Sequence, residues 1–164
     1  MLAARYASAS GHGLTPDLLA EGVSSLLDAR QPNGLWQTGL YGHQDQMISA
    51  PHGYAANMAA ALRADKYASV SDALAASIRS VLAHHAVRTP GGLNWPLVAG
   101  PTTRARGLPM LLQFCNGATG FSGQLGEAFE REYLLPAGEI VWHAGPRIKL
   151  PSLCQGAAGS GYAL

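Results

Sequence analysis

Charged residues are scarce in this sequence. Asp, Glu, Lys and Arg make up 13% of its 164 residues, whereas an average globular domain has about 25%. Hydrophobic residues make up 48%, which excludes an intrinsically disordered chain, because disorder requires low hydrophobicity and high net charge. Few charges, many alanines and 20 glycines together favour helices that pack closely on one another. The length is enough for one domain with its own core.

Long apolar runs, charge clusters and targeting features are also missing. No stretch approaches the about 18 apolar residues that a membrane-spanning helix needs. The net charge is +1 and the basic residues are scattered, so we expect no nucleic-acid partner, since phosphate binding concentrates positive charge on one face. The N-terminus lacks the apolar segment of a signal peptide. The two cysteines therefore fit thiols or metal ligands better than a disulfide, and we expect a cytoplasmic protein.

Apolar residues at helical spacing predict several helices. Residues 15–30 are typical, because Pro16 suits a first helical turn and Asp17 faces the positive helix end. The predicted helices cover residues 15–30, 52–62, 71–87, 118–135 and 138–144, and another opens at 157–164. No stretch alternates usefully as a strand. Residues 35–51 and 91–113 are predicted loops, the second with at most a short extended segment, so the predicted fold class is all-α.

A weak internal repeat is visible. Four stretches have a polar or thiol residue, then glycine and small residues, then a predicted helix; they lie at 11–14, 51–56, 115–120 and 154–159. Glycine at a helix start lets the first turn approach a neighbouring segment closely, because no Cβ intervenes. Repeated helix pairs built in this way bury one continuous core and can curve into a ring or solenoid.

The last two stretches place a cysteine at corresponding points. Cys115 and Cys154 each come just before a predicted helix N-terminus, where the helix dipole favours the thiolate. Two thiolates at matching points of two repeats would meet on one metal ion. The alternative is that both are ordinary small hydrophobic residues at glycine-rich helix starts.

These motifs are similar to those of the lanthionine synthetase C-like family. The family signature has a His-Gly pair, then Trp-Cys-His/Tyr-Gly-x-Pro-Gly, then Cys-His-Gly-x-x-Gly-Asn-Gly. Here the matching stretches are Pro51-His52-Gly53, Phe114-Cys115-Asn116-Gly117-Ala118-Thr119-Gly120 and Cys154-Gln155-Gly156-Ala157-Ala158-Gly159-Ser160-Gly161. The resemblance implies an (α/α) toroid of repeated helix pairs with glycine-rich inner-helix openings. Because family members are much longer, residues 1–164 would form an incomplete toroid: a truncated product, a fragment or one half of a split protein.

The resemblance also implies a chemistry. In the family, zinc is bound by the cysteine of the second motif and by the cysteine and histidine of the third, which correspond to Cys115, Cys154 and Gln155. Zinc with an open position keeps a substrate thiol as the thiolate, which adds to dehydroalanine or dehydrobutyrine to form a thioether. The histidine of the His-Gly pair, here His52, is the candidate for proton transfer.

Three positions depart from the signature. Gln155 stands where the third zinc ligand is expected, and a neutral amide is a poor zinc ligand beside imidazole. Asn116 replaces His or Tyr, and Ala56 replaces the second glycine of the first motif. We therefore expect an impaired zinc site.

Two function classes stay open. One is an enzyme that adds a thiol to dehydroamino acids, forming lanthionine or a glutathione thioether. The other is a non-catalytic, degenerate toroid that binds a peptide, glutathione or a protein partner. Exposed faces of an incomplete toroid would also favour self-association or pairing with a complementing chain. A glycosidase- or epimerase-like toroid needs clustered carboxylates, and the ten acidic residues do not cluster near the glycine motifs.

Two further groups are weaker candidates for a site. His84 and His85 are adjacent on a predicted helix, so their side chains are expected to diverge and not to share one ion. Arg104 and Arg106 lie in a predicted loop, where they would meet a carboxylate or phosphate of a peptide or, more simply, remain solvated.

Overall fold

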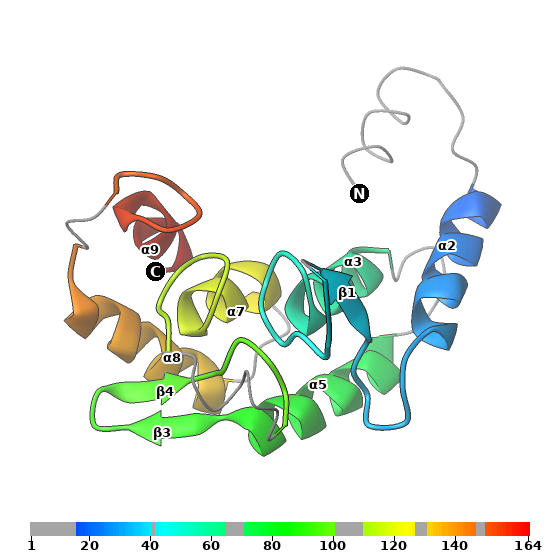
Figure 1. Ribbon diagram of the computed structural model, residues 1–164, viewed down its shortest axis with the longest axis horizontal. Coiled ribbons are helices and arrows are strands. Elements are labelled where there is room, and N and C mark those ends of the chain that lie inside the picture. The colour runs from blue at the N-terminus through cyan, green and yellow to red at the C-terminus, as the bar shows by residue number, and fades with distance from the viewer. Residues whose placement is uncertain (1–15, 41, 65–70, 101–109, 127–130, 147–149) are drawn as a thin grey trace.

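The computed structural model describes residues 16–40, 42–64, 71–100, 110–126, 131–146 and 150–164 (Figure 1). These residues form six helices and two β-hairpins. The helices are α2 (Pro16–Asp28), α3 (Tyr54–Arg63), α5 (Ser71–His85), α7 (Ala118–Leu125), α8 (Arg131–Ala144) and α9 (Ala157–Ala163), and the strands are β1 (Thr38–Leu40), β2 (His43–Asp45), β3 (Val87–Thr89) and β4 (Gly92–Asn94). Within these residues, no helix is long and apolar enough to cross a membrane.

The helices lie in two rows. In one row, α2 packs on α3, α3 on α7, and α7 on α9 (Figure 1). In the other row, α5 packs on α3 and α8 packs on α7, while β4 lies against α8. The architecture is therefore mostly helical and built from packed helix pairs. Closure of these pairs into a ring stays a prediction.

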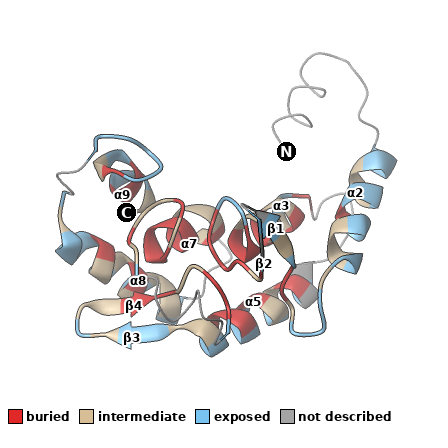
Figure 2. Cartoon of the chain, in the orientation of Figure 1, coloured by how far each residue is buried: buried red, intermediate tan, exposed pale blue. Residues whose placement is uncertain are grey.

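The core lies between the two rows. Buried residues concentrate on α3, α7 and the inner side of α5, whereas α2 and β3 are largely exposed (Figure 2). Trp95 and Phe121 pack at its centre, with ring centroids 5.0 Å apart, and Trp36 packs on Tyr54 at 6.0 Å. Because α3 and α7 carry many small residues, their backbones approach closely. This packing brings the loops that precede both helices to one region of the molecule.

Four predicted helices are confirmed within a few residues, those at 15–30, 52–62, 71–87 and 157–164. The prediction of helices over 118–135 and 138–144 is wrong. Helix α7 ends at Leu125, and α8 runs from Arg131 through Pro136 to Ala144. The apolar spacing continues across the gap, so periodicity alone joins the two helices. An interior proline costs a helix several kcal/mol, about 3 or more, and packing of α8 on α7 and β4 compensates here.

The structure is mostly helical, as predicted, and the two short hairpins are what the sequence analysis did not predict. The strands β1 and β2 pair antiparallel within the predicted loop 35–51, with Thr38 opposite Asp45. The strands β3 and β4 pair Val87 with Asn94 around a turn at Pro90 and Gly91. Strands of three residues are too short for an alternating pattern to show in the sequence. The second hairpin owes its position to a tertiary contact, the packing of β4 on α8.

Candidate functional site

Three helix openings share one geometry. Gly53, Gly117 and Gly156 directly precede α3, α7 and α9. In each case the chain six residues earlier folds back over the glycine, so that an added Cβ would overlap the carbonyl oxygen of Met47, Leu111 or Leu150 respectively. Gly117 also has a φ of 77°, which strongly favours glycine. The structure thus confirms the close approach that the repeated motif predicts.

Two of these loops are closed by a direct backbone hydrogen bond. Tyr54 N donates to the carbonyl of Met47 at 2.9 Å, and Ala157 N donates to the carbonyl of Leu150 at 3.1 Å. Each bond joins the first residue of a helix to the residue seven positions before it. The bond satisfies one of the helix N–H groups that otherwise have no partner.

The middle loop is closed by a side chain. The amide oxygen of Asn94 accepts from Ala118 N at 2.7 Å and from Trp95 N at 2.9 Å, and its Nδ2 donates to the carbonyl of Leu111 at 3.2 Å. Asn94 is 1% exposed. It takes the place of the direct bond between Leu111 and Ala118. This buried residue was missed by the sequence analysis, because nothing in the sequence shows that position 94 reaches α7.

The shared geometry fixes how the repeats align. When the three loops are superposed on their glycines, Pro51 corresponds to Cys115 and Cys154. His52 then corresponds to Asn116 and Gln155. His52 therefore occupies, in the first loop, the position of Gln155 in the third.

Cys115 and Cys154 lie together. Cys115 is at the tip of a tight turn in which Gln113 and Asn116 exchange backbone hydrogen bonds of 2.8 and 2.9 Å. Its N–H donates to the carbonyl of Cys154 at 3.3 Å, and the two thiols interact directly. Cys115 is buried and Cys154 is exposed. The packing of α7 on α9 brings together two residues 39 positions apart, as the repeat predicts.

The expected thiolate character of Cys115 is not what the structure shows. Burial, the Cys154 thiol and its charge raise the pKa of Cys115 to about 11, against a smaller opposing effect of the Asn116 side chain. Asn116 Nδ2 lies 3.3 Å from the Cys115 sulfur, and the thiol donates to Gln113 Oε1 at 3.5 Å. The dipole of α7 stabilises the Cys115 thiolate only weakly, because Cys115 precedes the first residue of the helix by three positions. Desolvation of the buried sulfur destabilises the thiolate more than the dipole stabilises it.

The residues implied as zinc ligands do not complete a catalytic zinc site. Such a site takes three protein ligands besides the substrate position. Gln155 is exposed, and its backbone N–H donates to the Ser152 hydroxyl at 3.4 Å. Across the part of the chain that the structure describes, no three His, Cys, Asp or Glu side chains come together to bind a metal. The groups found beside the Cys115 sulfur are the Cys154 thiol and the side-chain amides of Gln113 and Asn116.

His52 is an exposed residue at the end of the first loop, and its carbonyl accepts from the Thr38 hydroxyl at 3.4 Å. No contact between His52 and the cysteine pair is found among the residues described. Its role in proton transfer stays a prediction.

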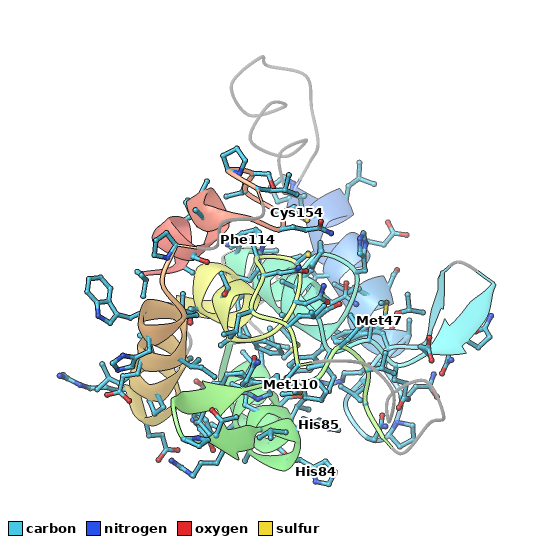
Figure 3. All side chains as sticks on the ribbon, turned by 60° about the vertical axis from the view of Figure 1, so that its left-hand side comes forward. Met47, His84, His85, Met110, Phe114 and Cys154 are labelled. Atoms are coloured by element: carbon cyan, nitrogen blue, oxygen red, sulfur yellow. The ribbon has the colours of Figure 1, made fainter. Side chains whose placement is uncertain are left out.

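An apolar surface flanks Cys154. Phe114 and Tyr162 pack edge to face, with ring centroids 5.6 Å apart. Tyr162 is 69% exposed and Leu153 50%. Figure 3 shows Phe114 and Cys154 at the same end of the molecule. This rim was also missed by the sequence analysis, because the exposure of large apolar residues in a loop and a short helix depends on what packs over them.

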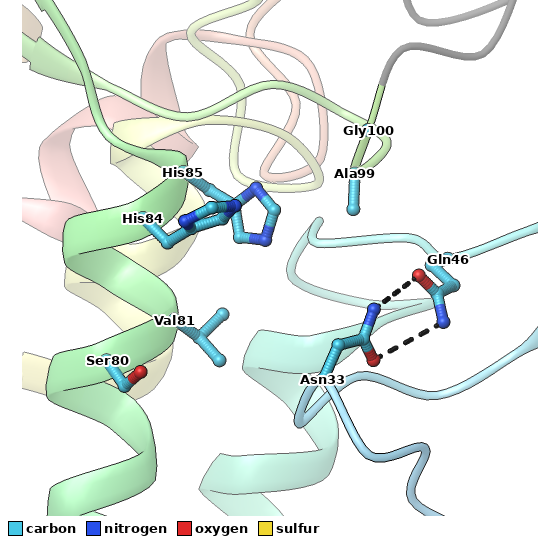
Figure 4. Close-up of a pocket in the computed structure, with 8 residues that line it drawn as sticks. All are labelled: Asn33, Gln46, Ser80, Val81, His84, His85, Ala99 and Gly100. Atoms are coloured by element: carbon cyan, nitrogen blue, oxygen red, sulfur yellow. Dashed lines mark hydrogen bonds between the residues drawn. The ribbon is translucent and has the colours of Figure 1, made fainter.

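The two histidines behave differently from the prediction. The rings of His84 and His85 do not diverge but meet edge to face, with centroids 4.7 Å apart. They border a pocket whose other side includes the hydrogen-bonded pair Asn33 and Gln46 (Figure 4). Burial, and then the neighbouring His84, lowers the pKa of His85. The arginines at 104 and 106, and the first repeat at 11–14, lie outside the described residues.

Comparison with known proteins gives one result. A family model described as lanthionine synthetase C-like protein matches residues 10–164. A search of curated proteins gives no match. The matched range includes all three loops and both cysteines.

Proposed function

This chain belongs to the lanthionine synthetase C-like family, and we propose that it is a non-catalytic member that binds a thiol-bearing peptide at the cysteine pair. The observation that supports this most is the incomplete donor set. Cys115 and Cys154 lie together, but an exposed glutamine occupies the position of the third zinc ligand. The thiol-addition step of the family depends on zinc, and the incomplete donor set leaves this chain without the third ligand for it.

The apolar rim supports a peptide as the ligand. Tyr162 and Leu153 expose large apolar surfaces beside Cys154. An aromatic contact that becomes buried when a peptide binds here contributes about 0.5–1.5 kcal/mol to the binding free energy beyond the effect of the buried area. A free thiol such as glutathione offers little to pack against such a rim, whereas a peptide with an apolar side chain next to its cysteine fills it.

The cysteine pair itself offers a defined polar contact. Asn116 donates toward the Cys115 sulfur, and Cys154 is open to solvent. A ligand thiol at Cys154 therefore lies beside the Cys115 thiol, whose raised pKa keeps it protonated and neutral. Binding under these conditions needs no charge on the ligand.

The test uses a fluorescent peptide with one cysteine next to a phenylalanine, and anisotropy as the readout. We expect Tyr162→Ala to weaken binding by about three- to tenfold, which corresponds to the aromatic contact. Trp142→Ala is the matched control, because Trp142 is 71% exposed but lies on α8. Equal affinity of wild type and Tyr162→Ala, or equal losses in both variants, would overturn the assignment of the rim.

A second candidate is the zinc-dependent thiol addition itself. One observation favours it: Cys115 and Cys154, which the resemblance implies as zinc ligands, lie together. The assay combines glutathione, a dehydroalanine peptide and zinc, and measures the thioether by mass spectrometry. We expect the buffer rate for wild type and a gain for Gln155→His, because imidazole adds the missing ligand. Thioether formation by wild type that Cys115→Ala abolishes would replace the non-catalytic proposal by this one.

A further inference from the structure

A groove lies along α5, between this helix and the segment that follows α2. Its helical wall consists of four side chains on one face of α5, spaced three, four and seven positions apart: Ser77, Ser80, Val81 and His84. Two hollows of about 330 and 550 Å³ open on the groove, and both are lined by Asn33, Ser80 and Val81, so they adjoin. Their volumes fall in the range of small-molecule sites, about 300–1,000 Å³.

One end of the groove is basic. Arg30 Nη1 donates to the Ser77 hydroxyl at 2.9 Å, which holds the guanidinium against α5. Burial raises the pKa of Tyr54 to about 12, and the nearby Ser77 hydroxyl and the Arg30 charge oppose this effect. A guanidinium has five N–H donors, and no carboxylate pairs with Arg30 among the residues that the structure describes. The remaining donors can therefore bind two oxygens of a phosphate or carboxylate.

The other end of the groove offers amides and imidazoles. Asn33 Nδ2 donates to Gln46 Oε1 at 2.8 Å, and Gln46 Nε2 donates to Asn33 Oδ1 at 3.5 Å. This amide pair faces the edge-to-face rings of His84 and His85 across the hollow (Figure 4). Each amide keeps a second N–H for a ligand, and the rings offer a surface on which a flat ligand can stack.

We propose that this groove is a binding site for a nucleoside monophosphate, with the phosphate at Arg30 and the base between the amide pair and the histidine rings. Ser77 and His84 are seven residues apart on α5, which is about 10 Å along the helix axis. The ribose of a nucleotide separates its phosphate from its base by a comparable distance. Imidazole rings stack on bases, and the amides of Asn and Gln bind the edge of adenine.

The distribution of charge favours this orientation of an anionic ligand. No Asp or Glu is found among the described residues that line the two hollows, so a cationic ligand would have no counter-charge there. The C-terminal end of α5, where His84 and His85 lie, disfavours an anion because of the helix dipole. The phosphate is therefore expected two turns away, at Arg30.

This inference does not rest on the proposed function, because neither Cys115 nor Cys154 lines the groove. The experiment is isothermal titration calorimetry of the whole chain with adenosine 5′-monophosphate, and separately with adenosine and with inorganic phosphate. We expect the nucleotide to bind at least about tenfold more tightly than either part, since only the nucleotide occupies both ends of the groove.

Two variants test the two features of the groove. Arg30→Ala should weaken binding of the nucleotide by about 10- to 100-fold and leave binding of adenosine unchanged. Arg63→Ala is the matched control, because Arg63 also donates to the protein, at 3.5 Å to the Gln124 carbonyl, but lies outside the groove. Ser80→Leu fills the place where the two hollows adjoin, at an exposed position, and should block the nucleotide but not inorganic phosphate.

Circular dichroism establishes that each variant is folded. The proposal is overturned if the nucleotide does not bind at millimolar concentration, or if adenosine or phosphate binds as tightly as the nucleotide. Equal losses in Arg30→Ala and Arg63→Ala would also overturn it. If Arg30→Ala does not fold, Ser80→Leu decides: unchanged affinity for the nucleotide in this variant rejects the groove as the site.

Discussion

Asn94 connects three backbone groups from two distant parts of the chain, and its removal should cost much of the protein's stability. Its side chain accepts from Trp95 N and Ala118 N and donates to the Leu111 carbonyl, all in a site that is 1% exposed. Asn94→Ala removes the side chain and leaves these groups without their partner. Water has no easy route to replace it in the tightly packed opening of α7.

The magnitude follows from these three bonds. A buried polar group that loses its partner costs about 1–3 kcal/mol, and partial relaxation makes the three losses less than additive. We therefore expect Asn94→Ala to lower the free energy of unfolding by about 3–5 kcal/mol. Native domains are stable by only about 5–15 kcal/mol, so this loss is a large part of the total. Circular dichroism during urea unfolding measures the change.

Asn94→Asp separates the acceptor role from the donor role. Its carboxylate still accepts from Trp95 N and Ala118 N but faces the Leu111 carbonyl with an oxygen in place of the donor. Burial and this repulsion should raise the carboxyl pKa in the folded protein above its ordinary value of about 3.9. A raised folded pKa gives stability that is complete below the unfolded pKa and is lost as pH rises through the folded pKa. Relative to wild type, the variant should therefore become more stable as pH falls from 7 to 5.

Asn33→Ala is the matched control, because Asn33 is an exposed asparagine whose side chain donates to Gln46 at 2.8 Å and accepts from Leu35 N at 3.2 Å. We expect this variant to lose only about 0.5–1.5 kcal/mol. The argument is refuted if Asn94→Ala costs no more than Asn33→Ala. It is also refuted if Asn94→Asp gains stability relative to wild type as pH rises.

Gly117→Ala should destabilise the protein by several kcal/mol, because the φ of Gly117 is 77° and the added Cβ meets a backbone carbonyl. Gly22→Ala should instead stabilise α2 by about 0.5–1 kcal/mol, since nothing lies within 4 Å of its added Cβ. Thermal unfolding compares the two variants, and equal effects would contradict the close approach at Gly117. Iodoacetamide at pH 8 should modify the exposed Cys154 well before Cys115, whose rate should rise with pH up to its pKa of about 11; peptide mapping that finds Cys115 first would count against its burial. The Trp142 side chain is 71% exposed, so we expect the protein to self-associate at micromolar concentration and Trp142→Lys to reduce this association. Sedimentation that shows a monomeric wild type would contradict this expectation.

The helices that the sequence predicts well are those with local signals. Helix α2 has Pro16 and Asp17 at its start and a clear apolar face, and these act through residues within one or two turns. The three glycine openings are equally local, because the need for close approach is visible as Gly53, Gly117 and Gly156 in similar settings. The meeting of two cysteines followed from that repeat. Their roles as metal ligands, and that of Gln155, stay predictions.

The sequence by itself determined the helical class of the chain, its family motifs and the places where helices begin. Only the tertiary structure decided the break between α7 and α8, the two hairpins, the bridge made by Asn94 and the raised pKa of Cys115. The Asn94 bridge and the raised pKa depend on groups far apart in the chain: Asn94 reaches Ala118 across 24 positions, and Cys115 meets Cys154. Local patterns reflect the free energy of single segments, whereas burial and hydrogen-bond partners are set by which segments pack together.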